Sequence, residues 1–146
     1  MKWVTRKNIR VNRVATAWLI RRFIDPQAEF IFVEPQEVAQ AQNQQGAKGF
    51  DAPGATYPHK DERGRCSFEA LVDEHCASDP VLKQIALIVR GADFPEEIDS
   101  TRESAGIRVI SHGFPLVTQD DAETVEKASF LYDALYAALQ AELRQR

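Results

Sequence analysis

The sequence contains no run of eighteen apolar residues, the approximate length that a helix needs to cross a bilayer. Its first residues, Met1–Arg6, also lack the continuous apolar segment of a secretory signal. We therefore expect a cytoplasmic protein that neither spans nor binds a membrane.

Cysteine is scarce, with only Cys66 and Cys76 in 146 residues. Two cysteines cannot define a disulfide scaffold, and in a chain without an export signal we expect free thiols. The sequence has no CxxC pair and no Cys/His cluster with the spacing of a zinc finger, which excludes a structural finger.

Acidic residues are absent from the first 24 positions, which hold seven basic side chains, although the whole chain has a net charge of −4. This asymmetry indicates local anion binding or a seam of internal ion pairs. We expect no direct binding of nucleic acid, because the acidic remainder of the chain would repel phosphates.

Hydrophobic periodicity and turn residues predict an α/β or α+β fold in which a small sheet from the N-terminal half packs with about five to six helices. We expect one domain over residues 1–146 with a helical C-terminal half. The predicted strands are Trp3–Thr5, Ala28–Val33, Lys48–Phe50 and Ala55–Tyr57, and the predicted helices are Asn12–Ile24, 35–46, Phe68–His75, Val81–Arg90, 100–113 and 118–144.

Capping residues set the expected ends of these helices. Asn12 and Ser67 are predicted N-caps, and Gly91 is predicted to end the helix before it. The pairs Ser100/Glu103 and Thr118/Asp121 each resemble a capping box.

The helix that starts near Asn12 is apolar on most of its surface, which predicts that it is buried. At 100° per residue, Arg22 falls within the apolar stripe that contains Trp18. A buried guanidinium needs a carboxylate, an anion or an aromatic face. Two interpretations remain open: a structural Arg–carboxylate pair, or an oxyanion site for which Arg13, Arg21 and Arg22 are the candidate anion-binding residues.

The segment from His59 to Glu69 holds the densest functional chemistry of the chain. If the loop folds back, His59 and Glu69 could begin a transition-metal site, with Asp93 as a candidate third ligand. The same pair is half of a general-base arrangement. A structural role is also open, since Glu69 complements the dipole of its own helix. Cys66 precedes the same helix and is a candidate redox thiol, although an inert, semi-buried cysteine is the favoured interpretation.

In the last helix, Glu126 and Asp133 fall together opposite the apolar face, with Phe130 between them. Such a face is usually solvated. It could instead contact the site or another subunit, which makes a homo-oligomer one of the hypotheses.

Several segments resemble, in order, the C-terminal domain of the ChrB family, which accompanies chromate-efflux transporters and is implicated in chromate-responsive expression. The resemblance covers essentially the whole chain and implies a role in handling ions. One departure is that no histidine follows Asp120-Asp121. The segments that carry the resemblance are Lys2–Arg6, Trp18–Asp25, Phe50–Gly54, His59, Arg65–Glu69, Ile88–Asp93 and Tyr132–Tyr136.

Together these observations predict an ion-handling domain associated with chromate resistance or response, whose partner is a small ion or oxyanion. A divalent transition metal is the candidate cofactor. Two alternatives remain: a metal-dependent hydrolase or redox enzyme centred on His59 and Glu69, and a structural or interaction module.

Overall fold

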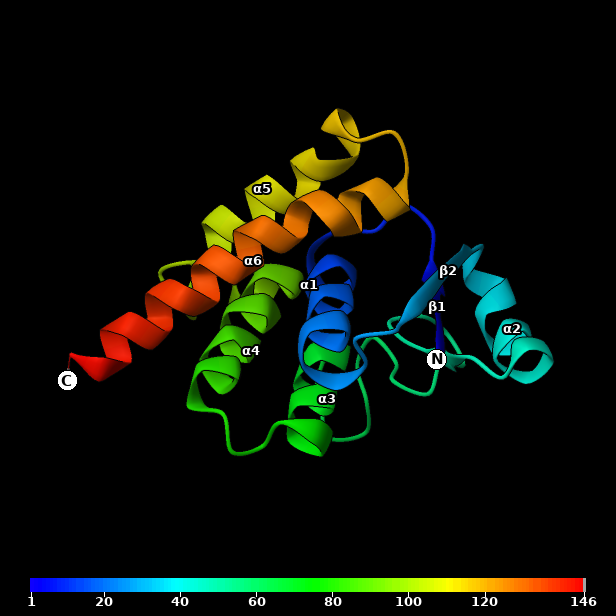
Figure 1. Cartoon of the computed structure of the whole chain (residues 1–146), viewed down its shortest axis with the longest axis horizontal. Helices are drawn as coiled ribbons and strands as arrows, with labels where there is room; N and C mark the ends of the chain where they lie inside the picture. Colours follow the sequence, from blue (N-terminus) through cyan, green and yellow to red (C-terminus); the bar gives the residue numbers. More distant parts are fainter. Residues whose placement is uncertain (146) are drawn as a thin grey trace.

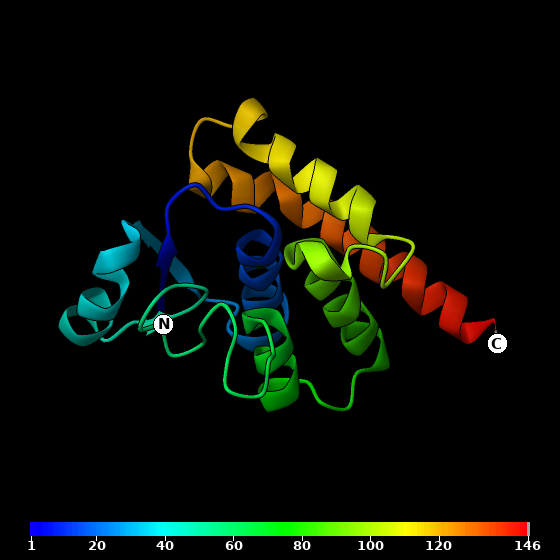
Figure 2. The ribbon, with the colours of Figure 1, turned by 180° about the vertical axis from the view of Figure 1, so that it is seen from behind.

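The computed structural model describes residues 1–145. A three-stranded sheet with helix α2 lies at one end of the molecule, and the remaining helices form a layered bundle beside it (Figures 1 and 2). The strands are β1 (Lys2–Arg6), β2 (Glu29–Val33) and β3 (Lys48–Gly49), and the helices are α1 (Val11–Leu19), α2 (Val38–Gln45), α3 (Ser67–His75), α4 (Pro80–Asp93), α5 (Ser104–Val117) and α6 (Asp121–Arg144). The predicted α/β class and helical C-terminal half are confirmed.

The sheet is parallel and has the strand order β2-β1-β3. Parallel neighbours need crossover connections, which α1 and α2 supply. Side chains alternate across each strand: Val4 and Ile31 pack with α2, whereas Trp3 and Phe30 join the main core. The C-terminal ends of β1 and β3 therefore emerge beside α1, where the polar site is built.

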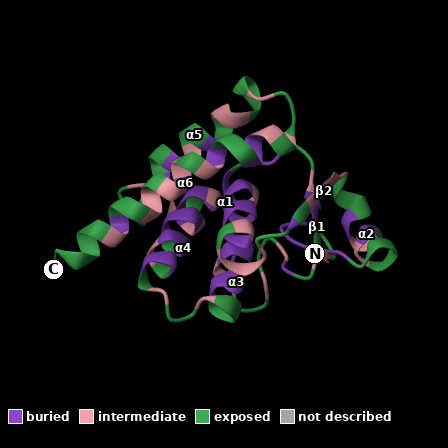
Figure 3. Cartoon of the chain, in the orientation of Figure 1, coloured by how far each residue is buried: buried purple, intermediate pink, exposed green. Residues whose placement is uncertain are grey.

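The main core fills the space between α1 and the helices α3, α4 and α6, as the buried faces in Figure 3 show. Trp18 is its centre, with ring centroids 5.5 Å from those of both Phe23 and Tyr132. Eight of the nine residues of α1 are buried, so the predicted burial of this helix is confirmed.

Arg22 is not buried, so the predicted buried guanidinium was wrong, although the predicted pairing of Arg22 with a carboxylate is present, at Asp133. The helix continues past Leu19 as a π-helical turn, Ile20–Ile24, in which the N–H of Asp25 donates to the carbonyl oxygen of Ile20. The additional residue in the turn changes the direction of the side chains that follow. The side chain of Arg22 is 59% exposed.

Two predicted N-caps are internal helical residues instead. Asn12 lies in the first turn of α1, fully buried, and its Nδ2 donates to Ser67 Oγ at 2.7 Å. The N-cap of α3 is Cys66 rather than Ser67. Asn12 and Ser67 therefore join α1 to α3, a tertiary role that capping statistics do not contain.

Three other predicted boundaries also moved. Gly91 does not end α4, because it lies inside the helix where it packs against α5: a Cβ at this position would come within 2.4 Å of Ser104 Oγ. The Ser100/Glu103 box does not form, and α5 starts at Ser104, whose N–H donates to Thr101 Oγ1. It then runs through Gly113 and Pro115 to Val117.

The last helix is capped by Asp120, which accepts the N–H of Glu123, and not by Thr118. The predicted strand Ala55–Tyr57 is reduced to one bridge between Phe50 and Tyr57. No helix within residues 1–145 is both long enough and apolar enough to cross a membrane.

Candidate functional site

A buried carboxylate, Asp51, is the centre of a polar cluster at the C-terminal ends of β1 and β3. It follows the bridge residue Phe50 and has a φ of 51°, in the left-handed region that aspartate adopts more readily than most residues. The residue is 1% exposed. An ionised group at this depth requires partners, and three basic side chains supply them.

Two of these partners are arginines from neighbouring elements. Arg6, at the end of β1, lies with Nη2 3.4 Å from Asp51 Oδ1, and its Nε donates to the backbone oxygen of Asp51 at 2.7 Å. Arg13, in the first turn of α1, donates from Nη1 to Asp51 Oδ2 at 3.3 Å. Burial lowers the pKa of Arg13, and the charge of Asp51 counteracts that shift. Asp51 thus fixes two guanidinium groups at one edge of the sheet.

The third partner is His59, whose Nδ1 lies 2.8 Å from Asp51 Oδ1 and 3.4 Å from Asp93 Oδ2. The hydrogen bond to Asp51 raises the pKa of His59 above its ordinary value, against the opposing effect of partial burial. The imidazole ring contacts the ring of Phe94 edge-on. Because Nδ1 is used internally, Nε2 is the nitrogen left for a ligand, and the side chain is 49% exposed.

Asp93 completes the cluster from the last turn of α4. Its side chain is 13% exposed, and burial raises its pKa to about 6. Oδ2 of Asp93 and Nε of Arg13 are both buried without a hydrogen-bond partner among residues 1–145. Such atoms are costly in a folded protein and often mark places where water or a ligand binds.

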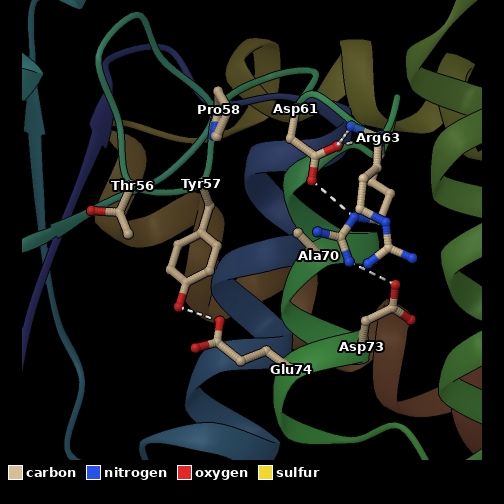
Figure 4. Close-up of a pocket in the computed structure, with 9 residues that line it drawn as sticks. Thr56, Tyr57, Pro58, Asp61, Arg63, Ala70, Asp73 and Glu74 are labelled. Carbon is tan, nitrogen blue, oxygen red and sulfur yellow. Dashed lines mark hydrogen bonds and ion pairs between the residues drawn. The ribbon is translucent and has the colours of Figure 1, made fainter.

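The loop that carries His59 is anchored to α3 on both sides. Tyr57 Oη donates to Glu74 at 2.6 Å, and Arg65, whose Nε donates to Asp61, donates from Nη1 to Asp73 at 2.9 Å. Figure 4 shows Tyr57 pointing to Glu74 of α3 at the edge of a pocket whose volume is about 390 Å³. These contacts restrain the position of the imidazole.

A second pocket, of about 580 Å³, opens beside the cluster. Its charged lining residues are all basic side chains, namely Arg6, His59 and Lys60, and the rest of its wall is alanine and proline. Lys60 Nζ lies 5.3 Å from the ring centroid of Phe94 and forms no ion pair among the residues described. The buried acids hold the bases in place, while the charged groups of an otherwise largely apolar pocket are basic.

Glu69 does not join His59 in a direct contact. Its Oε1 accepts a hydrogen bond from Arg90 Nη1 and another from the backbone N–H of Cys66, both at 3.0 Å. Arg90 also binds Glu97 through Nε at 2.8 Å. Among residues 1–145 no group of three or more His, Cys, Asp or Glu side chains is placed to hold a metal ion. Of the three predicted metal ligands, His59 and Asp93 therefore lie close together and Glu69 does not.

Cys66 is fully buried at the start of α3, and burial raises the pKa of its thiol. The effect of burial exceeds any stabilisation of a thiolate by the helix terminus. Of its two predicted roles, the structure favours the inert cysteine.

Of the predicted anion-binding arginines, only Arg13 lies in the Asp51 cluster. Arg22 Nε lies 3.0 Å from Asp133 Oδ1, and Arg21 Nη1 lies 3.6 Å from Glu126 Oε1. Trp18 Nε1 donates to the same oxygen of Asp133 at 2.9 Å. The two arginines and the two acids singled out on the last helix are thus partners of each other.

Sequence reasoning missed Asp51, Arg6 and Lys60 as site residues. One signal was present for Asp51, since an acid directly follows a short strand and precedes Pro53-Gly54. Arg6 ends the first strand, and in a parallel sheet the ends of neighbouring strands meet at one edge. Nothing in the local sequence marks Lys60, which depends on the fold of its loop.

Comparison with known proteins identifies the family. The family model described as the ChrB C-terminal domain matches residues 3–139. Protein ChrB of Cupriavidus metallidurans is 33% identical over 136 residues, which span 92% of this chain and 40% of that protein. No solved structure matches. The chain therefore belongs to the ChrB C-terminal domain family and covers less than half the length of its curated relative.

Proposed function

We propose that this domain binds a doubly charged tetrahedral oxyanion of the chromate class in the pocket beside Arg6, His59 and Lys60. The observation that carries the proposal is the all-basic charged lining of that pocket. Membership of the ChrB family, which is linked to chromate resistance, supports the choice of chromate among the oxyanions.

Electrostatics favour an anion over a cation here. Asp51 and Asp93 are mostly buried, whereas the imidazole and Lys60 are accessible. The raised pKa of His59 extends the pH range in which the ring is an imidazolium and donates from Nε2. An incoming anion would therefore meet N–H donors and positive charge before it meets a carboxylate.

Geometry favours a tetrahedral anion with several acceptor oxygens. Arg6 is held by Asp51 through Nε and Nη2, so its guanidinium plane is fixed before a ligand arrives. A preorganised guanidinium loses less conformational freedom on binding than a mobile lysine does. Lys60 lines the same pocket and can reach the anion as a flexible point charge.

Binding can be tested by isothermal titration of the protein with chromate, molybdate and sulfate at pH 7, with nitrate as a singly charged control. We expect saturable binding of the dianions and a loss of about tenfold or more in affinity in Lys60→Ala and His59→Gln. Arg63→Ala is the matched control, because it removes one positive charge from the same loop at a residue that does not line this pocket.

Equal weakening in Lys60→Ala and Arg63→Ala would show only a general effect of net charge and would contradict the site. Retained binding in both Lys60→Ala and His59→Gln would also contradict it. Circular dichroism of each variant establishes that the fold is intact. Arg22→Ala, the variant that the sequence alone would select, should bind like the wild type.

A second candidate is a divalent transition metal at His59. The Asp51–His59 hydrogen bond favours it, because carboxylates commonly orient histidine ligands in this way. Of the other predicted ligands, Asp93 lies beside Nδ1 rather than Nε2, and Glu69 is held by Arg90. Elemental analysis of untagged protein and of His59→Ala tests this role: a metal lost with the imidazole supports it, and its absence from both contradicts it.

A further inference from the structure

Strand β2 is an outer strand of the sheet and has one unpaired edge. Its backbone groups alternate in direction, and two hydrogen bonds fix which residues face β1: the N–H of Glu29 donates to the oxygen of Met1, and the oxygen of Val33 accepts from the N–H of Lys7. The N–H and C=O groups of Phe30 and Phe32 must therefore point away from β1. No other strand of residues 1–145 lies beyond them.

The free edge has a self-complementary sequence, Phe30-Ile31-Phe32. If a second copy pairs antiparallel with its centre at Ile31, each Phe30 faces Phe32 of the other copy, and their outward N–H and C=O groups form the hydrogen-bonded pairs. Glu29 then faces Val33, so no like charges are opposed. The register that uses every free backbone group is also the one that avoids charge repulsion.

The surface beside this edge combines an aromatic wall from β2 with charged side chains from neighbouring helices. A groove of about 390 Å³ between β2 and α6 is lined by Phe30, Phe32 and Val125, with the Arg21 guanidinium 4.9 Å from the centroid of the Phe30 ring. Charged side chains of α6 also line it, namely Glu123, Glu126 and Lys127. Natural edge strands are usually protected by charged residues, proline or bulges. The only charged residue of β2 is Glu29, at its first position.

We propose that two copies of this chain associate through antiparallel pairing of their β2 edges about Ile31, which joins the two three-stranded sheets into one. The phenylalanines of the two strands extend the aromatic surface across the junction. A five-residue strand pair buries little area, so we infer an association that depends on protein concentration.

A rival surface lies on α5, where Val109, Leu116 and Val117 are 73%, 84% and 73% exposed. This face is more apolar than β2, but the structure offers no hydrogen-bonding pattern or charge that selects an occupant for it. It therefore provides the control for the β2 proposal rather than a second proposal.

Site-specific disulfide formation tests the pairing directly. At the two-fold axis, the Ile31 residues form a non-hydrogen-bonded pair with Cα atoms about 4.5 Å apart, within disulfide range. In a Cys76→Ser background, which leaves the buried Cys66 as the native thiol, Ile31→Cys should form a linked dimer on air oxidation, seen as a doubled mass on non-reducing gels. Val33→Cys is the matched control, because it lies on the same face of β2 but is displaced from its own copy by four residues.

Sedimentation equilibrium of the unlinked protein provides the second arm. We expect the mass to rise from 16.5 kDa toward twice that value with concentration, and Phe32→Lys to remain monomeric. Leu116→Lys on α5 should associate like the wild type. A monomer at every concentration, equal crosslinking of Ile31→Cys and Val33→Cys, or an association lost only in Leu116→Lys would overturn the proposal. The anion titration is independent of all three outcomes.

Discussion

Two regions of this protein bring arginines and aspartates together, and they differ in which partner is buried. In the Asp51 cluster the acids are inside and the accessible lining of the pocket is basic. In the pairs between the π-helical turn and α6, Arg22 is 59% exposed and Asp133 42% exposed. The buried acid Asp51 holds basic side chains in place around a pocket. In the exposed pairs, each arginine and its carboxylate neutralise each other's charge. This difference makes the first region the candidate site.

Removal of the buried Asp51 carboxylate should reduce the stability of the protein more than any other change in these two regions. Asp51→Asn keeps the side-chain shape and a residue type that tolerates positive φ, but it leaves two guanidinium groups without their counter-charge. We expect a loss of about 3–5 kcal/mol in the free energy of unfolding, measured by urea denaturation. A loss below about 1 kcal/mol would show that the cluster contributes no more than a surface pair.

Asp93→Asn should have an effect that grows with pH. Because burial raises the pKa of Asp93 from 3.8 to about 6, the folded state binds this proton more tightly than the unfolded chain does. Its stabilising contribution is complete below pH of about 4 and is lost as the pH rises through about 6, by at most about 3 kcal/mol. Asparagine does not titrate, so the variant should gain stability relative to the wild type from pH 4 to pH 8. A constant difference across that range, measured by thermal unfolding, would contradict the buried position.

The titration of His59 should make anion binding in the Asp51 cluster depend on pH. The hydrogen bond to Asp51 raises the pKa of His59, so the imidazolium is present below that pKa and is lost as the pH rises through it. We expect the affinity for sulfate, a dianion throughout this range, to fall about tenfold between pH 6 and pH 9 in the wild type. His59→Gln should show a smaller dependence. The same slope in both proteins would exclude the imidazole from the site.

Arg22→Ala should have the smallest effect. Its partner Asp133 retains the hydrogen bond from Trp18, and exposed ion pairs contribute about 0–1 kcal/mol. Urea denaturation at low and high salt should show a small difference that decreases with salt. A loss near that of Asp51→Asn would mean that the two regions are energetically alike.

The sequence predicted the architecture better than the connections between its elements. Strand and helix segments follow from local periodicity, so the sheet and the helical second half were predictable. The π-helical turn was not, because one additional residue after Leu19 redirects Arg22 without a local sequence signal. At Gly91 a local signal was present but was misinterpreted. The glycine is explained by close packing against Ser104 and not by a turn.

The candidate site residues were each identified from their own stretch of sequence. Which of them lie together in space depends on the fold. Arg13, His59 and Asp93 were each predicted from local features, Arg13 for an anion site and His59 and Asp93 for a metal site. They meet because the start of α1, the loop after β3 and the end of α4 converge beside Asp51. Glu69 was assigned to His59 by proximity in the chain, whereas Arg90, on a neighbouring helix, binds it. Sequence distance along a loop is a weak guide to which charges pair across helices.

The location of the bound anion tests the central claim most directly. Crystals soaked in chromate allow chromium to be located by its anomalous scattering, independently of any assumption about ligands. We predict one chromium position in the pocket beside Arg6, His59 and Lys60, absent from crystals of Lys60→Ala. A chromium position beside Arg21 and Arg22, or none in the Arg6–His59–Lys60 pocket at a saturating concentration, would contradict the account.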